Sequence, residues 1–419
     1  MPPSIRHIPS SRTGRPVPEE DGPMTRTIIF TGKGGVGKTS VAAAHAVRSA
    51  REGCRTLLVS ADMAHNLGDL FGTEVGSAAK RAADHLYLQE LDPGQLMRQE
   101  FPNARQALID LMAGAGLAAG GLTETFPLPG FDILFSLLKI GRLCRNGGYD
   151  RLLVDCPPTG ETLALLKFPE LLSWYMEKFY PVGKAVTRAM APIAGAKYRV
   201  KLPSRKAMNE IGRLHESLVE LQELLRDGSA CTVRLVCIPE KMAVEETKRS
   251  LMQLNLYGYC VDGAYINRVL PEEAGGGFLL RWRDSQQRYL DELERVFAGY
   301  PMTRLPWYPQ EVRGMEAAGQ LADALPETPG LFEIRAHAEN ETYEATSSGW
   351  LLRLCLPGAE GGVSVCRRGN DLEIHLPGAA RCLPLPDTLR TAVMTGYALR
   401  EGTLRVSFQN ADGSEGGQG

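Results

Sequence analysis

The feature that most constrains this chain is a glycine-rich loop between an apolar run and a helical segment. The loop follows Thr27–Phe30 and reads Gly32-Lys33-Gly34-Gly35-Val36-Gly37-Lys38-Thr39. This is the pattern of a phosphate-binding loop, with the strand before it and the helix after it that the pattern requires. Glycines let backbone N–H groups curl around a polyphosphate, and the N-terminal end of the helix that follows, 40–51, favours the same negative charge. We therefore expect an α/β domain that binds a nucleotide.

Individual side chains of this loop have distinct expected roles. Lys38 should reach the β- and γ-phosphates of ATP, and the hydroxyl of Thr39 should bind Mg²⁺. Lys33 is a second lysine, which a plain phosphate-binding loop does not need. The predicted nucleotide contacts of the segment are Gly32, Lys33, Gly34, Gly35, Val36, Gly37, Lys38, Thr39 and Ser40.

Two carboxylates follow other apolar runs. Asp62 comes just after Thr56–Ser60, and Asp155 ends the run Leu152–Asp155. Ligands of open α/β sheets bind at the carboxyl ends of the strands, so both side chains are expected at the nucleotide. We predict that Asp155 holds Mg²⁺, directly or through water. Asp62 is predicted to contribute to the metal site and to orient or deprotonate the water that attacks the γ-phosphorus. A role for Asp62 as a helix cap is compatible with both.

The length of 419 residues leaves room for two domains. Helical stretches separate short apolar runs over residues 24–340, which predicts a phosphate-loop domain with a parallel sheet flanked by helices. The predicted strands of this domain are Thr27–Phe30, Thr56–Ser60, Leu86–Glu90, Leu152–Asp155, Val233–Pro239, Val261–Asn267 and Thr303–Leu305.

Two helical inserts, at about 93–143 and 163–225, are too long for simple crossovers between strands. Both are rich in large apolar side chains, including Phe101, Phe131, Leu134, Phe135 and Leu138 in the first insert. These inserts form either a helical lid over the sheet or an apolar groove for a hydrophobic ligand.

The character of the sequence changes near residue 340. Short alternating runs punctuated by turn residues predict a small antiparallel β-sandwich over residues 343–410. Its predicted strands are Trp350–Leu356, Gly362–Arg367, Leu372–Leu376, Leu383–Leu385 and Leu404–Phe408. We expect residues 1–23 and 411–419 to be disordered, because they lack hydrophobic periodicity. Met24 leaves open whether residues 1–23 are part of the native protein.

Composition excludes several classes of function. The formal net charge of −2 provides no general field that would attract nucleic acid. No apolar run reaches the length of a bilayer crossing, and the N-terminus lacks the apolar segment of a secretory signal. The nine cysteines are scattered and include no Cys-x-x-Cys pair, so we expect reduced thiols in a cytoplasmic protein.

The loop and the two aspartate motifs, in this order, resemble the ATPase family that includes the arsenite-pump ATPase and the targeting factor for tail-anchored membrane proteins. The resemblance covers about residues 25–321. Lys33 matches the family's characteristic extra lysine, which in relatives crosses a dimer interface to the partner's nucleotide. Asp62 matches the catalytic aspartate of a loop that usually has a proline where this chain has Met63.

The resemblance implies further nucleotide contacts. Asn66 matches a residue near the partner's nucleotide, and Glu246 matches one that approaches the ribose across the dimer. Asn267 matches an asparagine that contacts adenine. Pro306 and Trp307 lie in a segment, 305–314, that is similar to the family's loop that packs on the base.

The C-terminal segment, about 343–410, resembles the α-crystallin domain of small heat-shock proteins. The resemblance is carried by 351–358, by 365–374, by 381–386 and by the closing run 402–408. Some ATPases of the family carry such a domain at the C-terminus, and sheet edges of that fold bind extended segments by strand addition.

Together these features predict Mg²⁺-dependent ATP hydrolysis that drives the opening and closing of a homodimer. The apolar inserts and the C-terminal domain favour a chaperone or targeting ATPase that binds a hydrophobic polypeptide client and associates transiently with a membrane through a partner. The alternative is an ATPase subunit for arsenite or antimonite transport. Thiolates suit such a soft ion, but the family's site needs three, and the region of the two inserts, 93–225, offers only Cys144 and Cys156.

Overall fold

The computed structural model describes residues 25–62, 66–103, 131–146, 148–160, 163, 205–272, 276–327, 330–335, 340–359 and 361–410. The predictions for residues 1–23 and 411–419, and for most of both inserts, lie outside the described residues. Helices of the described part include none that is both long and apolar enough to cross a membrane.

The larger part of the molecule is built on an eight-stranded sheet in the order β3-β4-β2-β5-β1-β6-β7-β8. Its strands are β1 (Arg26–Thr31), β2 (Thr56–Ser60), β3 (Lys80–Ala83), β4 (Leu86–Glu90), β5 (Arg151–Asp155), β6 (Cys231–Cys237), β7 (Val261–Val269) and β8 (Met302–Pro306). All neighbours pair in parallel except β3, which forms an antiparallel edge on β4. The predicted parallel sheet is thus confirmed, with β3 as an addition that the sequence analysis missed.

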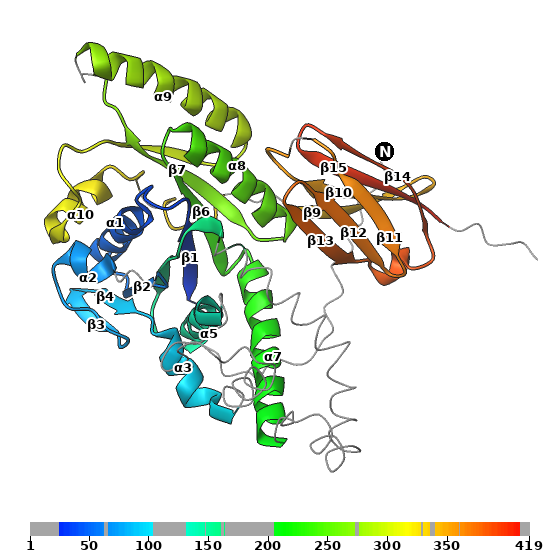
Figure 1. The fold of residues 1–419 in the computed structure, drawn as a ribbon, viewed down its shortest axis with the longest axis horizontal. Helices are drawn as coiled ribbons and strands as arrows, with labels where there is room; N and C mark the ends of the chain where they lie inside the picture. The colour runs from blue at the N-terminus through cyan, green and yellow to red at the C-terminus, as the bar shows by residue number, and fades with distance from the viewer. Residues whose placement is uncertain are drawn as a thin grey trace, which may run out of the picture.

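Helices cover both faces of this sheet, as Figure 1 shows. They are α1 (Lys38–Arg51), α2 (Asn66–Phe71), α3 (Pro93–Glu100), α5 (Phe131–Asn146), α7 (Arg205–Arg226), α8 (Lys241–Leu256), α9 (Gly277–Val296) and α10 (Gly314–Asp323). α1 packs on α2 and α10, whereas α5 packs on α7 and α8 packs on α9. Right-handed crossovers put the first group on one face and the others on the opposite face. The strands are therefore buried on both sides, which explains their nearly continuous apolar runs.

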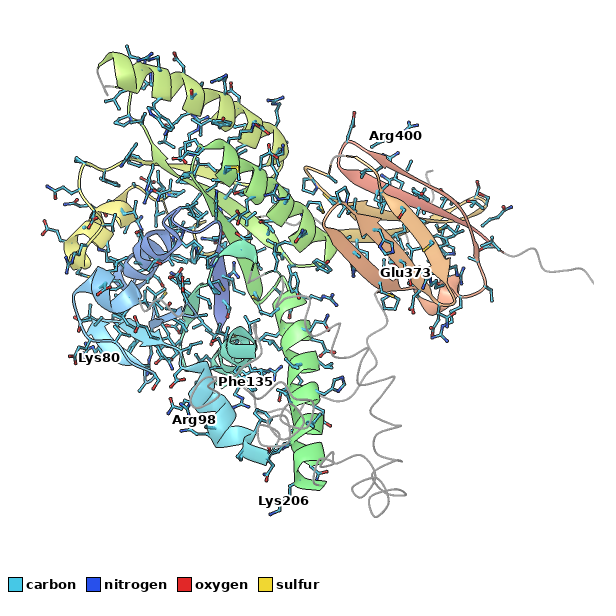
Figure 2. All side chains as sticks on the ribbon, in the orientation of Figure 1. Lys80, Arg98, Phe135, Lys206, Glu373 and Arg400 are labelled. Carbon is cyan, nitrogen blue, oxygen red and sulfur yellow. The ribbon has the colours of Figure 1, made fainter. Side chains whose placement is uncertain are left out.

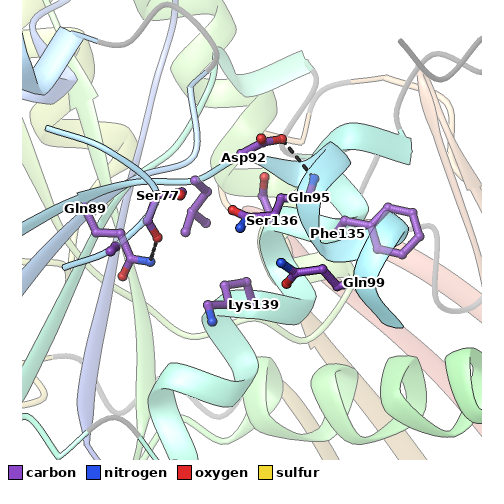
Figure 3. Close-up of a pocket in the computed structure, with 10 residues that line it drawn as sticks. Ser77, Gln89, Asp92, Gln95, Gln99, Phe135, Ser136 and Lys139 are labelled. Carbon is purple, nitrogen blue, oxygen red and sulfur yellow. Dashed lines mark hydrogen bonds between the residues drawn. The ribbon is translucent and has the colours of Figure 1, made fainter. Parts of the chain in front are cut away.

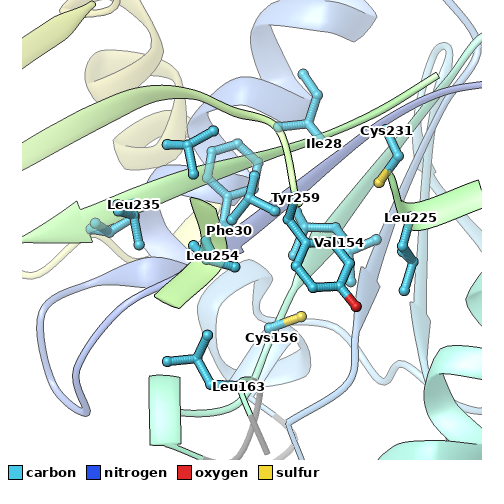
Figure 4. Packing of buried hydrophobic residues seen from close by; sticks show 14 of the residues in the cluster. Ile28, Phe30, Val154, Cys156, Leu163, Leu225, Cys231, Leu235, Leu254 and Tyr259 are labelled. Carbon is cyan, nitrogen blue, oxygen red and sulfur yellow. The ribbon is translucent and has the colours of Figure 1, made fainter. Parts of the chain in front are cut away.

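The core lies between the central strands and these helices. Phe30 of β1, Val154 of β5 and Leu235 of β6 are fully buried. Phe30 packs against His45 of α1, with ring centroids 4.8 Å apart, and Figure 4 shows the buried thiol of Cys156 and the ring of Tyr259 among the core residues. Such tight packing positions the strand ends that carry the predicted site.

The described part of the first insert belongs to this core. Phe101, Phe135 and Leu138 are each no more than 3% exposed, and the rings of Phe101 and Phe135 pack 6.0 Å apart. Phe135 lies on α5 close to α3 (Figure 2). One of the two interpretations of the insert was an exposed apolar groove. These three side chains do not line such a groove, because they are buried. The side chains of Phe131 and Leu134 lie outside the description.

A hollow of about 180 Å³ opens nearby, between β4, α3 and α5. Figure 3 shows that mostly polar side chains line it, with Gln89, Gln99 and Lys139 around the space. The amide of Gln89 donates to the carbonyl of Ser77 at 2.7 Å. This hollow is therefore unsuited to an apolar segment of polypeptide.

Two antiparallel sheets form the C-terminal part, in the orders β14-β15-β10-β9 and β11-β12-β13. The strands are β9 (Glu341–Thr346), β10 (Gly349–Cys355), β11 (Ser364–Arg368), β12 (Asp371–Leu376), β13 (Ala379–Pro384), β14 (Val393–Arg400) and β15 (Thr403–Gln409). Apolar side chains alternate inward along β12 and β15, which confirms the predicted sandwich. The strands β9 and β14 were not predicted from the sequence.

The sandwich docks on the C-terminal end of α8. The Arg381 guanidinium donates to the carbonyl of Leu256 at 2.6 Å, and the Tyr257 hydroxyl donates to the carbonyl of Ala380 at 2.9 Å. The Asn340 amide donates to the carbonyl of Tyr259 at 2.9 Å. Backbone carbonyls on both sides of this junction thus accept hydrogen bonds from side chains of the opposite side. These bonds fix the orientation of the sandwich on α8.

A buried cluster of charged side chains connects three central strands. It lies toward the amino ends of β1 and β7, away from the phosphate-binding loop at their carboxyl ends. Asp262 on β7 accepts hydrogen bonds from Arg234 on β6, at 3.0 and 3.2 Å, and from Arg26 on β1, at 2.9 Å. Arg234 and Asp262 have no exposed surface. The carboxylate is therefore the common counter-ion of two guanidinium groups.

Asp262→Ala is expected to lower the free energy of unfolding by about 3–5 kcal/mol, because it leaves a buried guanidinium without its counter-ion. The matched control is Asp323→Ala, which removes the exposed ion pair with Arg51 and should cost less than about 1 kcal/mol. Denaturant unfolding of the three proteins measures both. Equal losses for the two variants would contradict the role given to the buried cluster.

Candidate nucleotide site

The predicted site residues gather at the carboxyl ends of the central strands. β5 pairs with β1 on one side and with β2 on the other, so that Asp155 lies level with Phe30 and with Ser60. The loop after β1, the segment after β2 and the end of β5 therefore meet at one edge. This is the position at which open α/β sheets bind ligands.

Backbone geometry explains the glycines of the loop. Gly35 and Gly37 have φ values of 80° and 94°, which only glycine adopts without strain. A Cβ on Gly32 would lie 2.1 Å from the carbonyl oxygen of Val236, so the loop passes against β6. At Gly35, by contrast, no atom of the described residues lies within 4 Å of such a Cβ, which leaves space for a phosphate group. α1 then begins at Lys38, two residues before its predicted start.

The two lysines lie close together. The ammonium group of Lys38 donates to the backbone carbonyl of Lys33 at 3.4 Å, and the Lys38 side chain is largely buried. Lys38 is therefore held over the loop, where a phosphate group would be a stronger partner than a carbonyl. The Lys33 side chain is half-buried.

The closest contact of the site joins the loop to β5. The hydroxyl of Thr39 donates to Oδ2 of Asp155 at 2.7 Å, and Asp155 is fully buried. Burial raises the pKa of Asp155 to about 7. The Thr39 hydrogen bond and the charge of Lys38 oppose the rise, and the charge of Asp62 adds to it. Burial thus disfavours the ionised form of Asp155, which a bound cation would favour.

Three buried oxygens at this edge have no hydrogen-bond partner among the described residues: Oγ1 of Thr31, Oδ1 of Asp155 and Oγ1 of Thr159. Buried oxygens of this kind are rare, and a bound ion or an ordered water is one explanation for them. A carboxylate oxygen and two hydroxyls are hard donors of the kind that Mg²⁺ prefers. The residues present thus fit a hydrated magnesium ion bound to phosphate.

Asp62 lies after β2 and is half-buried. Its backbone N–H donates to the hydroxyl of Ser60 at 3.2 Å, which turns the chain at the end of the strand. Its effect on the pKa of Asp155 is consistent with a position next to the metal-binding carboxylate. The segment 63–65 and the side chain of Asn66 lie outside the description, so the helix-capping role and the role of Asn66 stay predictions.

The structure gives Asn267 a contact that the sequence analysis did not foresee. Its side-chain amide donates to the carbonyl of Val36 at 2.9 Å and lies against Gly37, so β7 supports the loop directly. Its predicted contact with adenine stays a prediction.

The other predicted contacts lie at the same edge. Glu246 lies on α8, which follows β6, and is half-buried. Pro306 ends β8. The backbone N–H of Trp307 donates to the carbonyl of Val269 at 2.8 Å, and the residue is 52% exposed. The indole is thus free to cover a base, and the roles of all three residues stay predictions.

Thr31 and Thr159 were not among the predicted site residues. Thr159 lies in the loop after β5 and its N–H donates to the carbonyl of Gly32 at 3.2 Å, so this loop is attached to the phosphate-binding loop. Its place in the run Pro157-Pro158-Thr159-Gly160 was a usable signal, whereas Thr31 resembles any other residue at the end of a buried strand.

Comparison with known proteins agrees with this geometry. Residues 25–327 match the pattern of the family described as "Anion-transporting ATPase", and residues 347–408 match an "HSP20-like domain found in ArsA".

Relatives extend this agreement over nearly the whole chain. A protein of Prosthecochloris vibrioformis named "Putative arsenical pump-driving ATPase" is 37% identical over 397 residues, which are 91% of this chain and 96% of the relative. One of the same name from Chlorobaculum tepidum is 38% identical over 295 residues, or 70% of this chain and 73% of the relative. "ATPase get3" of Pyrenophora tritici-repentis is 29% identical over 314 residues, or 73% and 92%.

Asp155→Asn is expected to stabilise the protein above about pH 7 in the absence of nucleotide and Mg²⁺, and to change little near pH 4. A carboxyl group whose pKa is higher in the folded than in the unfolded chain binds its proton more tightly when folded. Stability is therefore lost as the pH rises from about 4 to about 7, and asparagine removes this loss while it still accepts the Thr39 hydrogen bond. The measurement is the free energy of unfolding against pH. An effect of equal size at both ends of the range would refute the assignment.

Proposed function

This chain belongs to the family of anion-transporting ATPases and is an ATPase, and from this premise we propose that two copies of it enclose and hydrolyse Mg²⁺-bound ATP in a cycle that binds and releases a hydrophobic polypeptide. The observation that carries the proposal is the pair Thr39–Asp155. It joins a phosphate-binding loop to a fully buried carboxylate, one oxygen of which has no hydrogen-bond partner among the described residues.

Thr39 and Asp155 would hold the magnesium ion, with Asp62 next to it. When bound, such an ion draws negative charge from the phosphate oxygens that it contacts. Lys38 and the N–H groups of the loop bind the β- and γ-phosphates and keep the transferred group in line with its attacking water.

In the proposed mechanism Asp62 acts on that water. Its carboxylate orients the water and takes up the proton as the new oxygen–phosphorus bond forms. The bond from the γ-phosphorus to the β–γ bridging oxygen breaks in the same displacement, and ADP leaves with the bridging oxygen. Lys33 of a second copy would neutralise the charge that develops on this oxygen, in the manner of an arginine finger.

Exposed apolar side chains at this edge support a dimer that closes over the nucleotide. Met242, in the first turn of α8, is 64% exposed, and Trp307, after β8, is 52% exposed. Both lie beyond the carboxyl ends of strands, and large exposed apolar residues are typical of surfaces that meet a partner. Contact with a second copy would also bring in the residues predicted to act across the interface, Lys33, Asn66 and Glu246.

The client remains a proposal that rests on the family resemblance and on the attached sandwich. Because the sandwich is hydrogen-bonded to the C-terminal end of α8, while Glu246 lies near the other end, movement of α8 on hydrolysis would move the sandwich. We also propose a cytoplasmic location, because none of the nine cysteines forms a disulfide within the described structure. Contact with a membrane would come through a partner protein.

Transport of arsenite or antimonite is the second candidate, favoured by the names of two relatives. The thiols give it less support. Cys144 and Cys156 are buried, and burial raises the pKa of Cys144 to about 11. The two candidates can be separated by measuring the rate of ATP hydrolysis with an apolar peptide and with arsenite. Transport would be favoured if arsenite stimulates hydrolysis and if Cys144→Ser and Cys156→Ser abolish this stimulation.

Asp62→Asn is expected to lower the rate of ATP hydrolysis by about 10²–10⁴-fold, because the attacking water loses its base. ATP affinity should change little, since Lys38 and the loop are intact. The matched control is Asp69→Asn, which makes the same change at an exposed position on α2 and should leave hydrolysis unchanged. Steady-state kinetics and nucleotide binding measure both effects. Normal turnover in Asp62→Asn would overturn the mechanism.

A further inference from the structure

The outer face of the β11-β12-β13 sheet gathers side chains that bind metals. Leu372, Ile374 and Leu376 of β12 point inward and are buried, so Glu373 and His375 between them point outward. Figure 2 shows Glu373 on this C-terminal sheet, away from the ATPase part. Across the strand pair, Cys366 of β11 lies directly opposite Glu373 and therefore faces the same side.

The distances within this group suit one small cation. Sγ of Cys366 lies 3.6 Å from Oε2 of Glu373, and Nε2 of His375 lies 3.7 Å from the same oxygen. One ligand atom from each residue lies within 4.8 Å of the other two. Zinc binds sulfur at about 2.3 Å and nitrogen or oxygen at about 2.0–2.2 Å in a tetrahedron, so its ligand atoms are separated by roughly 3.3–3.8 Å.

We propose that Cys366, Glu373 and His375 form a binding site for a divalent cation of the zinc class. A thiolate, an imidazole and a carboxylate are the donor types that zinc takes in proteins. The two anionic ligands neutralise the charge of the ion, and the rigid strand pair keeps all three side chains on one face. With three protein ligands the fourth position goes to water, so the site is of the open kind and binds less tightly than a closed structural zinc site.

Two neighbours define the limits of this site. Arg368 is 75% exposed and its guanidinium contacts Oε2 of Glu373 at 3.2 Å, so it competes with a cation for that carboxylate. Cys382 of β13 lies opposite Glu373 on the other side, but its sulfur is outside the group of three ligand atoms. The site therefore predicts that removing the charge of Arg368 strengthens cation binding, whereas replacing the Cys382 thiol leaves binding unchanged.

The test is addition of Co²⁺ to the full-length, reduced protein, because a cobalt–thiolate bond gives a charge-transfer band in the near ultraviolet and tetrahedral cobalt gives intense visible bands. We expect these bands to form with one equivalent of Co²⁺ and to disappear when Zn²⁺ is added. Cys366→Ser should remove the charge-transfer band, and His375→Ala should weaken Co²⁺ binding by about tenfold or more. Both residues are exposed, and thermal unfolding checks that the variants are folded.

Two matched variants complete the experiment. Cys382→Ser should leave the bands unchanged, and Arg368→Gln should tighten Co²⁺ binding several-fold because it removes the competing cation. Bands that persist in Cys366→Ser, or that Cys382→Ser abolishes, would overturn the proposal, as would the absence of any band in the unmodified protein. Hydrolysis of ATP should be equal in all four variants, so this result is independent of the proposed ATPase cycle.

Discussion

The hydrogen bond between Thr39 and Asp155 is the interaction on which the account of this protein depends. It connects the first helical turn after the phosphate-binding loop to the end of the neighbouring strand, and it uses only one oxygen of a fully buried carboxylate. Burial of a carboxylate with an unused oxygen is costly unless a cation compensates for it. Burial raises the pKa of Asp155, and its Oδ1 has no hydrogen-bond partner among the described residues. The geometry therefore suits a cation and a polyphosphate.

The central part of this arrangement was predictable from the sequence because each of its segments carries a local signal. A phosphate-binding loop has a fixed spacing, and Asp62 and Asp155 each follow a buried strand, so the parallel sheet alone brings them to one edge. The contacts of Asn267 with Val36 and of Thr159 with Gly32 were not predictable, since they join segments far apart in the chain. The strand β3 was missed because its sequence, Lys80–Ala83, is short, polar and exposed. The edge strand β14 is largely exposed as well, and its apolar pattern is correspondingly weak.

The apolar insert illustrates a limit of pattern reading. Phe101, Phe135 and Leu138 have the same side chains whether they line a groove or fill a core, and only the fold decides between these uses. The attachment of the sandwich to α8 is likewise beyond the sequence, since it depends on backbone carbonyls that accept bonds from Arg381, Tyr257 and Asn340. This junction makes α8 a physical connection between the predicted ribose contact Glu246 and the C-terminal domain. The face with Cys366, Glu373 and His375 lies on the outside of that domain and leaves the connection free.

The central claim is that each ATP is hydrolysed by Asp62 of one copy with the help of Lys33 of the other. The most direct measurement is the ATPase rate of a mixture of two inactive variants, Lys33→Ala and Asp62→Asn, after exchange of subunits. A mixed dimer contains one site in which both side chains are intact, so the mixture should recover roughly a quarter of the unmodified rate. A mixture that stays as inactive as its two components would contradict the claim, because it would mean that both side chains act within a single copy.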